Sequence, residues 1–223
     1  MKLLAKWHVW LGWLVGVPIL MWTLTGLLMV SRPIEEVRGN HLRIAQDPAP
    51  LVIEGSALAS SEFPIREIST RMQDGRAVAL LTDMDGNIRR VDFATGEPIA
   101  PMTAVDARAL VADRIVGGDK IRSVTLFEAD EVPIDFRREM AVWQVALEDG
   151  AHIYVGRDTG AIEAVRTRFW RAFDFAWGLH IMDLQTRGNT SHPILILFAI
   201  LAALTALMGC SLMFRKRQAR IKA

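Results

Sequence analysis

AVALLTDMDGNIRRVDFATG (77–96) and VWQVALEDGAHIYVGRDTG (142–160) are the stretches that decide the fold, because both follow one plan. In each, Asp-Gly separates two runs of β-forming residues, and the second run ends in Thr-Gly. Asp-Gly between two such runs is a strong signal for a tight β-hairpin, since the turn requires residues that accept positive φ. We therefore predict an internal repeat built from antiparallel strands.

The repeat extends to an earlier element in both copies. IREIS (65–69) precedes the first stretch and IRSVT (121–125) precedes the second. The second copy has more residues between this element and its hairpin, which predicts an insertion within FEADEVPIDFRRE (127–139).

A helix is predicted immediately before the second copy. Apolar residues recur at helical spacing from Val105 to Val116, with Thr103 or Asp106 as a cap and Gly117-Gly118 as a stop. SALASS (56–61) is a degenerate counterpart before the first copy. The middle of the chain is thus expected to be two tandem units, each a helix followed by a small antiparallel sheet.

Two uncharged runs, Val9 to Val30 and Pro193 to Phe214, flank the repeat. Each rises about 33 Å as a helix, enough to cross a hydrocarbon core of about 30 Å. The first run has an alternative interpretation as a cleaved signal peptide, but it is longer than the usual apolar segment and no small-residue cleavage site follows it. We expect an α+β membrane protein in which two transmembrane helices flank the tandem region.

Basic residues mark the outer ends of both runs. They are Lys2 and Lys6 before the first run, and Arg215, Lys216, Arg217, Arg220 and Lys222 after the second. The positive-inside rule then predicts a two-pass protein of a bacterial inner membrane, with both termini cytoplasmic and the centre periplasmic. The expected parts are the N-terminus and first span (1–30), the periplasmic tandem region (31–167), an amphipathic interfacial helix and turn (168–190), and the second span with its basic tail (191–223).

Several classes of site are not supported by the sequence. A net charge of +1 indicates no nucleic-acid surface, and Cys210, the single cysteine, excludes an intramolecular disulfide. The acidic turn at 83–87 lacks the spacing of a calcium loop, so we interpret it as a hairpin turn. His41 and His152 have no ligand-type residue at suitable spacing, and no phosphate-binding, dinucleotide, zinc-protease or nucleophile motif is present.

His8, Gly12 and Gly16 share one face of the first predicted span. One interpretation makes His8 an interfacial residue beside several tryptophans, with the glycines packing the two spans together. The other makes His8 a ligand of haem iron, with the glycine face accommodating the porphyrin. Both interpretations remain open at this stage.

A second histidine cluster lies in RFWRAFDFAWGLHIMDLQTRGNTSHP (168–193). We expect an amphipathic helix that carries His180 and is broken at Gly188-Asn189, with Asp183 placed to fix the His180 tautomer. Ser191 would cap the next helix, so that His180 and His192 flank a turn and are candidates to ligate one iron.

Any haem would therefore be expected at two membrane depths, because His8 lies near the opposite membrane face from the other two histidines. An inner haem would need a second His8 from a dimer, or a ligand from a partner protein. An outer haem would use His180 with His192, or a pair of His180 residues across a dimer.

Four features together resemble one family: KWHVWLGWLVG (6–16), the tandem repeat, WGLHIMDL (177–184) and a final span ending in FRKR (214–217). They resemble the PepSY-associated transmembrane proteins of Gram-negative bacteria, over nearly the whole chain. The resemblance implies an inner-membrane protein with a periplasmic PepSY region. Its larger relatives include haem b-containing ferrisiderophore reductases, which have four or more spans where this chain has two. In that pattern His8 and His180 are the haem ligands, and His192 is a candidate only by proximity.

Two functions follow as expectations. The first is a b-type haem protein that passes electrons across the membrane to a periplasmic acceptor such as a ferric siderophore. Such a protein would be a component of a ferric-chelate reductase. The second is a non-catalytic accessory or assembly subunit of a larger membrane complex, such as a respiratory complex, with the PepSY region binding a partner. Ligand counting predicts a homodimer or a subunit of such a complex, and regulation of a periplasmic peptidase is a third alternative.

Overall fold

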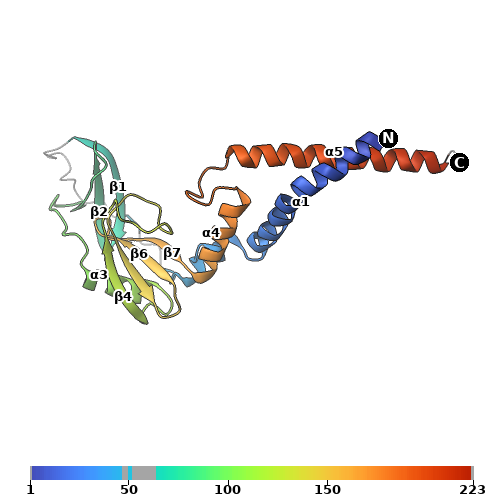
Figure 1. Ribbon diagram of the computed structural model, residues 1–223. Coiled ribbons are helices and arrows are strands. Elements are labelled where there is room, and N and C mark those ends of the chain that lie inside the picture. The colour runs from blue at the N-terminus through green and yellow to red at the C-terminus, as the bar shows by residue number, and fades with distance from the viewer. Residues whose placement is uncertain (1, 47–49, 52–63, 222–223) are drawn as a thin grey trace. The chain divides into compact units, whose positions relative to one another are not determined.

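The computed structural model describes residues 2–46, 50–51 and 64–221, and the chain divides into two compact units. A helical unit comprises Met1–Ile34 and Phe169–Ala223. A strand-rich unit comprises Glu35–Arg168. The long helices of the first unit and the strands of the second are drawn in Figure 1.

The helical unit contains three helices: α1 (Lys2–Val30), α4 (Arg168–His180) and α5 (Pro193–Ile221). Helices α1 and α5 pack against each other and run antiparallel, so the start of α1 and the end of α5 lie at the same end of the unit (Figure 1). Both are long and apolar enough to cross a membrane, over Lys2–Val30 and Pro193–Arg215. Few of their residues are buried, which leaves apolar side chains exposed along both helices.

Helix α4 ends at His180, eight residues before Gly188, so the predicted break at Gly188-Asn189 is wrong. Met182 adopts a positive φ of 56°, and the Asp183 amide donates to the Gly178 carbonyl at 2.9 Å. This pattern of a left-handed residue and a long backward hydrogen bond terminates a helix, usually with glycine at the left-handed position. Pro193 opens α5 as predicted, because its missing N–H would have no helical partner there.

Two antiparallel sheets form the strand-rich unit, which confirms the expected α+β fold class. The first sheet has the order β1 (Ile65–Gln73), β2 (Arg76–Asp83), β3 (Ile88–Asp92). The second has the order β4 (Ile121–Phe127), β5 (Val142–Leu147), β6 (His152–Gly156), β7 (Ile162–Arg166).

The two sheets repeat each other in detail. The first pair of strands is irregular between Ile65 and Glu67 in one sheet and between Ile121 and Ser123 in the other. The Thr-Gly turns also match: Gly96 donates to Asp92 at 2.8 Å, and Gly160 donates to Gly156 at 2.9 Å, each through its backbone N–H. The hairpin glycines, Gly86 and Gly150, have φ values of 90° and 83°. The predicted internal repeat is therefore confirmed.

The predicted helix and insertion are also present. Thr103 is the N-cap residue of helix α3 (Ala104–Arg114). The Thr103 side chain accepts a hydrogen bond from the backbone N–H of Asp106, and the Asp106 side chain accepts one from the backbone N–H of Thr103. The segment between β4 and β5 is the insertion, whereas β1 and β2 are joined by the tight turn Asp74-Gly75. The predicted counterpart of α3 at 56–61 lies outside the described residues.

Two layers cover the second sheet. On one face, Ala107 and Val111 of α3 and its C-cap residue Ile115 form a core with the strands, which contribute Val145, Leu147, Ile153, Val155 and Val165. On the other face, Phe136 of the insertion packs with Val142, Tyr154 and Ala164. Coverage of both faces explains why β6 is almost continuously buried rather than alternating. Two short helices, α2 (Ile34–Val37) and η1 (Asn40–Leu42), precede these sheets.

Candidate functional site

His180, the last residue of α4, lies against α1 inside the helical unit. Its Nδ1 is 2.9 Å from the Thr25 hydroxyl, and its backbone carbonyl accepts a hydrogen bond from the Trp22 indole at 2.8 Å. A Cβ built on Gly26 would lie 3.7 Å from the His180 ring, so this glycine faces the imidazole. Trp22, Thr25 and Gly26, which lie within little more than one turn of α1, thus fix both the backbone and the ring of His180.

The hydrogen bonds of Thr25 favour one tautomer of His180. The Thr25 hydroxyl has one hydrogen, and the Met21 carbonyl at 2.8 Å is its acceptor in the geometry usual for threonine within a helix. With that hydrogen directed at Met21, the hydroxyl oxygen accepts a hydrogen bond from Nδ1–H of His180. In this tautomer Nε2 carries the lone pair, and no hydrogen bond of Nε2 is found among the described residues. An imidazole oriented through one nitrogen, with the other free, has the arrangement of a metal-ligating histidine.

Asp183 does not fix the His180 tautomer, contrary to the prediction from its spacing. Its carboxylate instead accepts from the Thr186 hydroxyl and from the backbone amides of Thr186, Gly188 and Asn189, the last at 3.0 Å. These hydrogen bonds, led by that of the Thr186 hydroxyl, hold the pKa of Asp183 far below its usual range. Asp183 therefore organises the α4–α5 connection. The hydrogen bond to the His180 ring, which we had predicted for Asp183, is made by Thr25 instead.

His8 lies near the start of α1 and contacts α5. A Cβ built on Gly209 would be 3.0 Å from the His8 ring, so any larger residue there would require the ring to shift. The Nδ1 atom of His8 is buried and has no hydrogen-bond partner in the part of the chain that the structure describes. Gly12 and Gly16 have open space where a Cβ would be, so they do not pack the two spans together.

His192 lies just before α5, beside a cavity of about 480 Å³ in the helical unit. Its Nδ1 is also buried without a hydrogen-bond partner. The cavity lining is mainly apolar and includes Pro18, Met21 and Leu179, with Asp183 and Gln185 as polar members. His180 is not among the lining residues, so the structure does not bring His180 and His192 to one cavity.

The candidate histidines therefore occupy two levels of the helical unit. His8 and Thr25 are 17 positions apart on α1, which corresponds to about 26 Å along the helix axis. Among residues 2–46, 50–51 and 64–221, no group of three or more histidine, cysteine or acidic side chains is placed to hold a metal ion. Each level offers imidazole nitrogen alone, which is the donor type found in b-type haem proteins.

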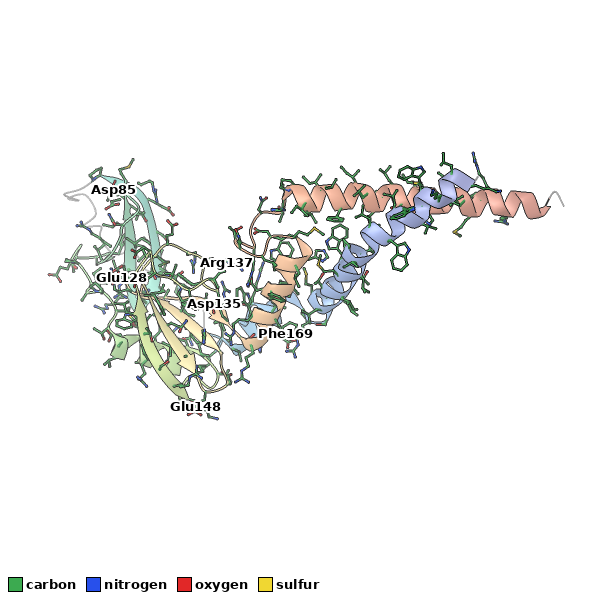
Figure 2. The ribbon with its side chains drawn as sticks, in the orientation of Figure 1. Asp85, Glu128, Asp135, Arg137, Glu148 and Phe169 are labelled. Carbon is green, nitrogen blue, oxygen red and sulfur yellow. The ribbon has the colours of Figure 1, made fainter. Side chains whose placement is uncertain are left out.

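Sequence reasoning missed a buried polar cluster in the strand-rich unit. Asp135, in the insertion, is labelled in Figure 2. It accepts a hydrogen bond from the Tyr154 hydroxyl at 2.6 Å and lies 3.4 Å from Nδ1 of His152. Burial alone would raise the pKa of Asp135, but the hydrogen bonds from His152 and Tyr154 lower it overall. Burial, followed by the bond to Asp135, raises the pKa of Tyr154. No local signal could reveal the cluster, since Asp135 and Tyr154 are 19 positions apart.

Comparison with family models gives one match, described as the PepSY-associated TM region, over residues 5–223. The chain belongs to this family. No curated protein and no solved structure matches it. The PepSY-associated family, together with the two long apolar helices, makes this a membrane protein with a PepSY region. Both histidine levels and the strand-rich unit lie within the matched range.

Proposed function

We propose that this PepSY-associated protein binds haem b in a bacterial inner membrane and passes electrons to a periplasmic acceptor, namely ferric iron held by a siderophore. The observation that carries the proposal is the Thr25–His180 pair, which fixes one imidazole nitrogen and leaves the other free. The basic residues at the ends of α1 and α5 support cytoplasmic termini and a periplasmic strand-rich unit.

The residues present fit a haem group. His8 has a buried Nδ1 without a partner, and His180 has Nε2 free, so each can give one axial imidazole. The open space beside Gly12 and Gly16 leaves the face of α1 that carries His8 accessible to a flat group. Haem, when bound, would supply a reversible one-electron couple.

The protein's own residues then have defined roles. Thr25 keeps the His180 proton on Nδ1, and Trp22 anchors the end of α4 to α1 through the His180 carbonyl. Asp183 holds the connection to α5, where His192 borders the apolar cavity. Apolar side chains on both long helices exclude water, which favours hydrogen bonds and charge interactions within the unit.

One chain supplies His8 at the first level, and at the second level His180 does not line the cavity beside His192, so we propose that a second axial ligand comes from another chain. Symmetric pairing of two copies would bring two His8 residues, or two His180 residues, together. The low burial of α1 and α5 is consistent with a further protein surface against them. We therefore propose a homodimer or a subunit of a larger membrane complex.

The test is the absorbance of the full-length protein in mild detergent, oxidised and then reduced, with the haem content determined chemically. We expect a b-type spectrum, and we expect His8→Ala and His180→Ala each to lower the haem content. His152→Ala is the matched control, because that histidine lies in the strand-rich unit beside Asp135. A colourless wild-type protein, or full absorbance in both helical variants, would contradict the proposal.

One observation favours a second candidate, an accessory subunit without electron chemistry. Trp7, Trp10 and Trp13 are exposed by 59%, 67% and 81%, and they border a groove of about 470 Å³ on α1. Aromatic residues are enriched at protein interfaces as well as at membrane boundaries. A colourless protein that co-purifies with a respiratory complex, and loses it when these tryptophans are replaced by alanine, would support this function.

A further inference from the structure

The junction between the two repeats contains a cavity of about 250 Å³. Its walls come from four places: the segment after η1, the end of β1, the end of α3 and the β6–β7 turn. The side chains of Arg43, Arg71, Gln73 and Arg114 are among those that line it. This volume is below the range of about 300 to 1,000 Å³ typical of drug-sized ligands, so it suits a small molecule.

The cavity carries more positive than negative charge. Arg43, Arg71 and Arg114 are cationic, and among the residues that the structure describes Asp74 is the single carboxylate in the lining. Asp74 is 81% exposed and lies 3.8 Å from Arg114, which also pairs with Asp113. The charges of Arg43 and Arg71 are therefore not balanced by a carboxylate of the lining.

Arg43 and Arg71 are held by backbone carbonyls rather than by acidic side chains. Arg43 donates to the Ile162 carbonyl at 3.3 Å, and Arg71 donates to the Thr159 carbonyl at 2.5 Å. Arg71 is partly buried, and its buried Nε–H has no acceptor among the described residues. Carbonyl oxygens orient a guanidinium but do not neutralise it, so the guanidinium of Arg71 can still pair with an anion.

The carboxylate of Glu163, whose charge acts on Arg71, is already engaged. Glu163 accepts the Thr159 hydroxyl at 2.6 Å and pairs with Arg138 at 2.9 Å. Burial lowers the pKa of Arg71, and the charge of Glu163 only partly opposes this effect. The environment therefore favours an additional negative group near Arg71.

A second arginine, Arg90 of β3, likewise has an Nε–H without an acceptor among the described residues. Arg90 is 9% exposed, donates to the Ala100 carbonyl at 2.6 Å, and has its buried Nε–H without an acceptor. It shares one face of the first sheet with Arg71 and Gln73, because the strand register pairs Arg71 with Val78 and Arg90 with Leu80. A Cβ on Gly160 would be 1.8 Å from the Arg90 guanidinium, so glycine is required in the turn that both arginines contact.

We propose that this cavity binds a small molecule through a carboxylate or phosphate group, held by the guanidinium groups of Arg43 and Arg71 with Arg114 and Gln73 beside them. Planar guanidinium donors match the paired oxygens of such groups. The inference goes beyond the proposed electron transfer and does not depend on it, since the site lies wholly within the strand-rich unit.

The test is calorimetric titration of the full-length protein in neutral detergent at low ionic strength. Citrate probes carboxylate binding and inorganic phosphate probes phosphate binding, with sodium chloride as the reference salt. Saturable binding of either probe supports the proposal and identifies which oxyanion the site prefers. Absence of saturable binding of both probes would overturn it.

The variants distinguish a built site from general charge attraction. Arg43→Gln is expected to weaken binding at least tenfold, because one charge-assisted contact to the ligand is lost. Arg71→Gln should weaken it as much, and Gln73→Ala provides a neutral change in the same lining should Arg71→Gln not fold. Arg108→Gln removes the same charge from the exposed side of α3 and should change affinity less than twofold. Equal losses in Arg43→Gln and Arg108→Gln would refute the site.

Discussion

Replacing Tyr154 by phenylalanine tests how the insertion is held on the second sheet. The Tyr154 hydroxyl donates to Asp135 at 2.6 Å and accepts from the Gln144 side chain at 2.7 Å. The ring itself stacks on Phe136 with centroids 4.8 Å apart, and phenylalanine preserves that contact. The substitution therefore removes two hydrogen bonds and little else.

The expected loss can be estimated from these two bonds. A hydrogen bond to a charged group contributes about 1.5–3 kcal/mol and a neutral one about 0.5–1.5 kcal/mol, and both partners here are left inside the protein. We expect Tyr154→Phe to lower the free energy of unfolding by about 2–4 kcal/mol. For a domain of this size, that corresponds to a fall of roughly 5–15 °C in the unfolding midpoint.

Thermal unfolding of the full-length protein in detergent gives the midpoint, and amide hydrogen exchange of the 127–142 segment reports whether the insertion is loosened. Asp85→Asn is a suitable control, because Asp85 is exposed in a hairpin turn (Figure 2) and its replacement should change stability by less than about 0.5 kcal/mol. In a double-mutant cycle, Tyr154→Phe and Asp135→Asn should couple. A Tyr154→Phe protein as stable as the wild type, with unchanged exchange in the insertion, would refute this account.

Three further outcomes are expected. Gly39→Ala should destabilise the strand-rich unit by about 1–3 kcal/mol in thermal unfolding, because φ of Gly39 is 74° and the new Cβ would lie 2.5 Å from Val165. An unfolding midpoint equal to that of the wild type would contradict this. Because the pKa of Asp135 is depressed in the folded protein, its contribution to stability is present above the unfolded-state pKa and is lost as pH falls through the folded-state pKa. Asp135→Asn should therefore make the free energy of unfolding less dependent on pH in the acid range. Asp183→Ala should speed amide exchange at 186–189, and unchanged rates there would show that the carboxylate does not hold this loop.

Local signals in the sequence predicted local structure well. Asp-Gly and Thr-Gly define turns within a few residues, so the hairpins and the repeat could be predicted without tertiary information. The capping box at Thr103 is likewise complete within four residues. The end of α4 was missed because Met182 takes a left-handed conformation, which the sequence signals only when the residue is glycine.

The contacts of the candidate site could not be predicted in the same way. The Thr25–His180 bond joins positions 155 apart, and the sequence offers a nearer polar partner in Asp183. Proximity in sequence favoured Asp183, whereas the backbone amides of the loop compete successfully for its carboxylate. His8 was identifiable, because ionisable residues within membrane-spanning helices are rare.

The register of the two sheets shows how one repeat face came to be used in two ways. In the first copy Arg71 pairs with Val78, and at the corresponding position of the second copy Phe127 pairs with Val142. Likewise, Arg90 pairs with Leu80 in the first copy, where Tyr154 pairs with Gln144 in the second. The arginines of the first copy thus stand where the second copy has aromatic residues.

In the second copy, that face is closed by the insertion, with Phe136 stacked on Tyr154. In the first copy, the same face presents guanidinium groups to the Thr159–Gly160 turn, and their Nε–H donors are left without acceptors. A face that only joined the two repeats would be more stable with apolar side chains, because unpaired buried charges are costly. The arginines at this position are therefore better explained by an oxyanion bound at the junction than by the packing of the fold.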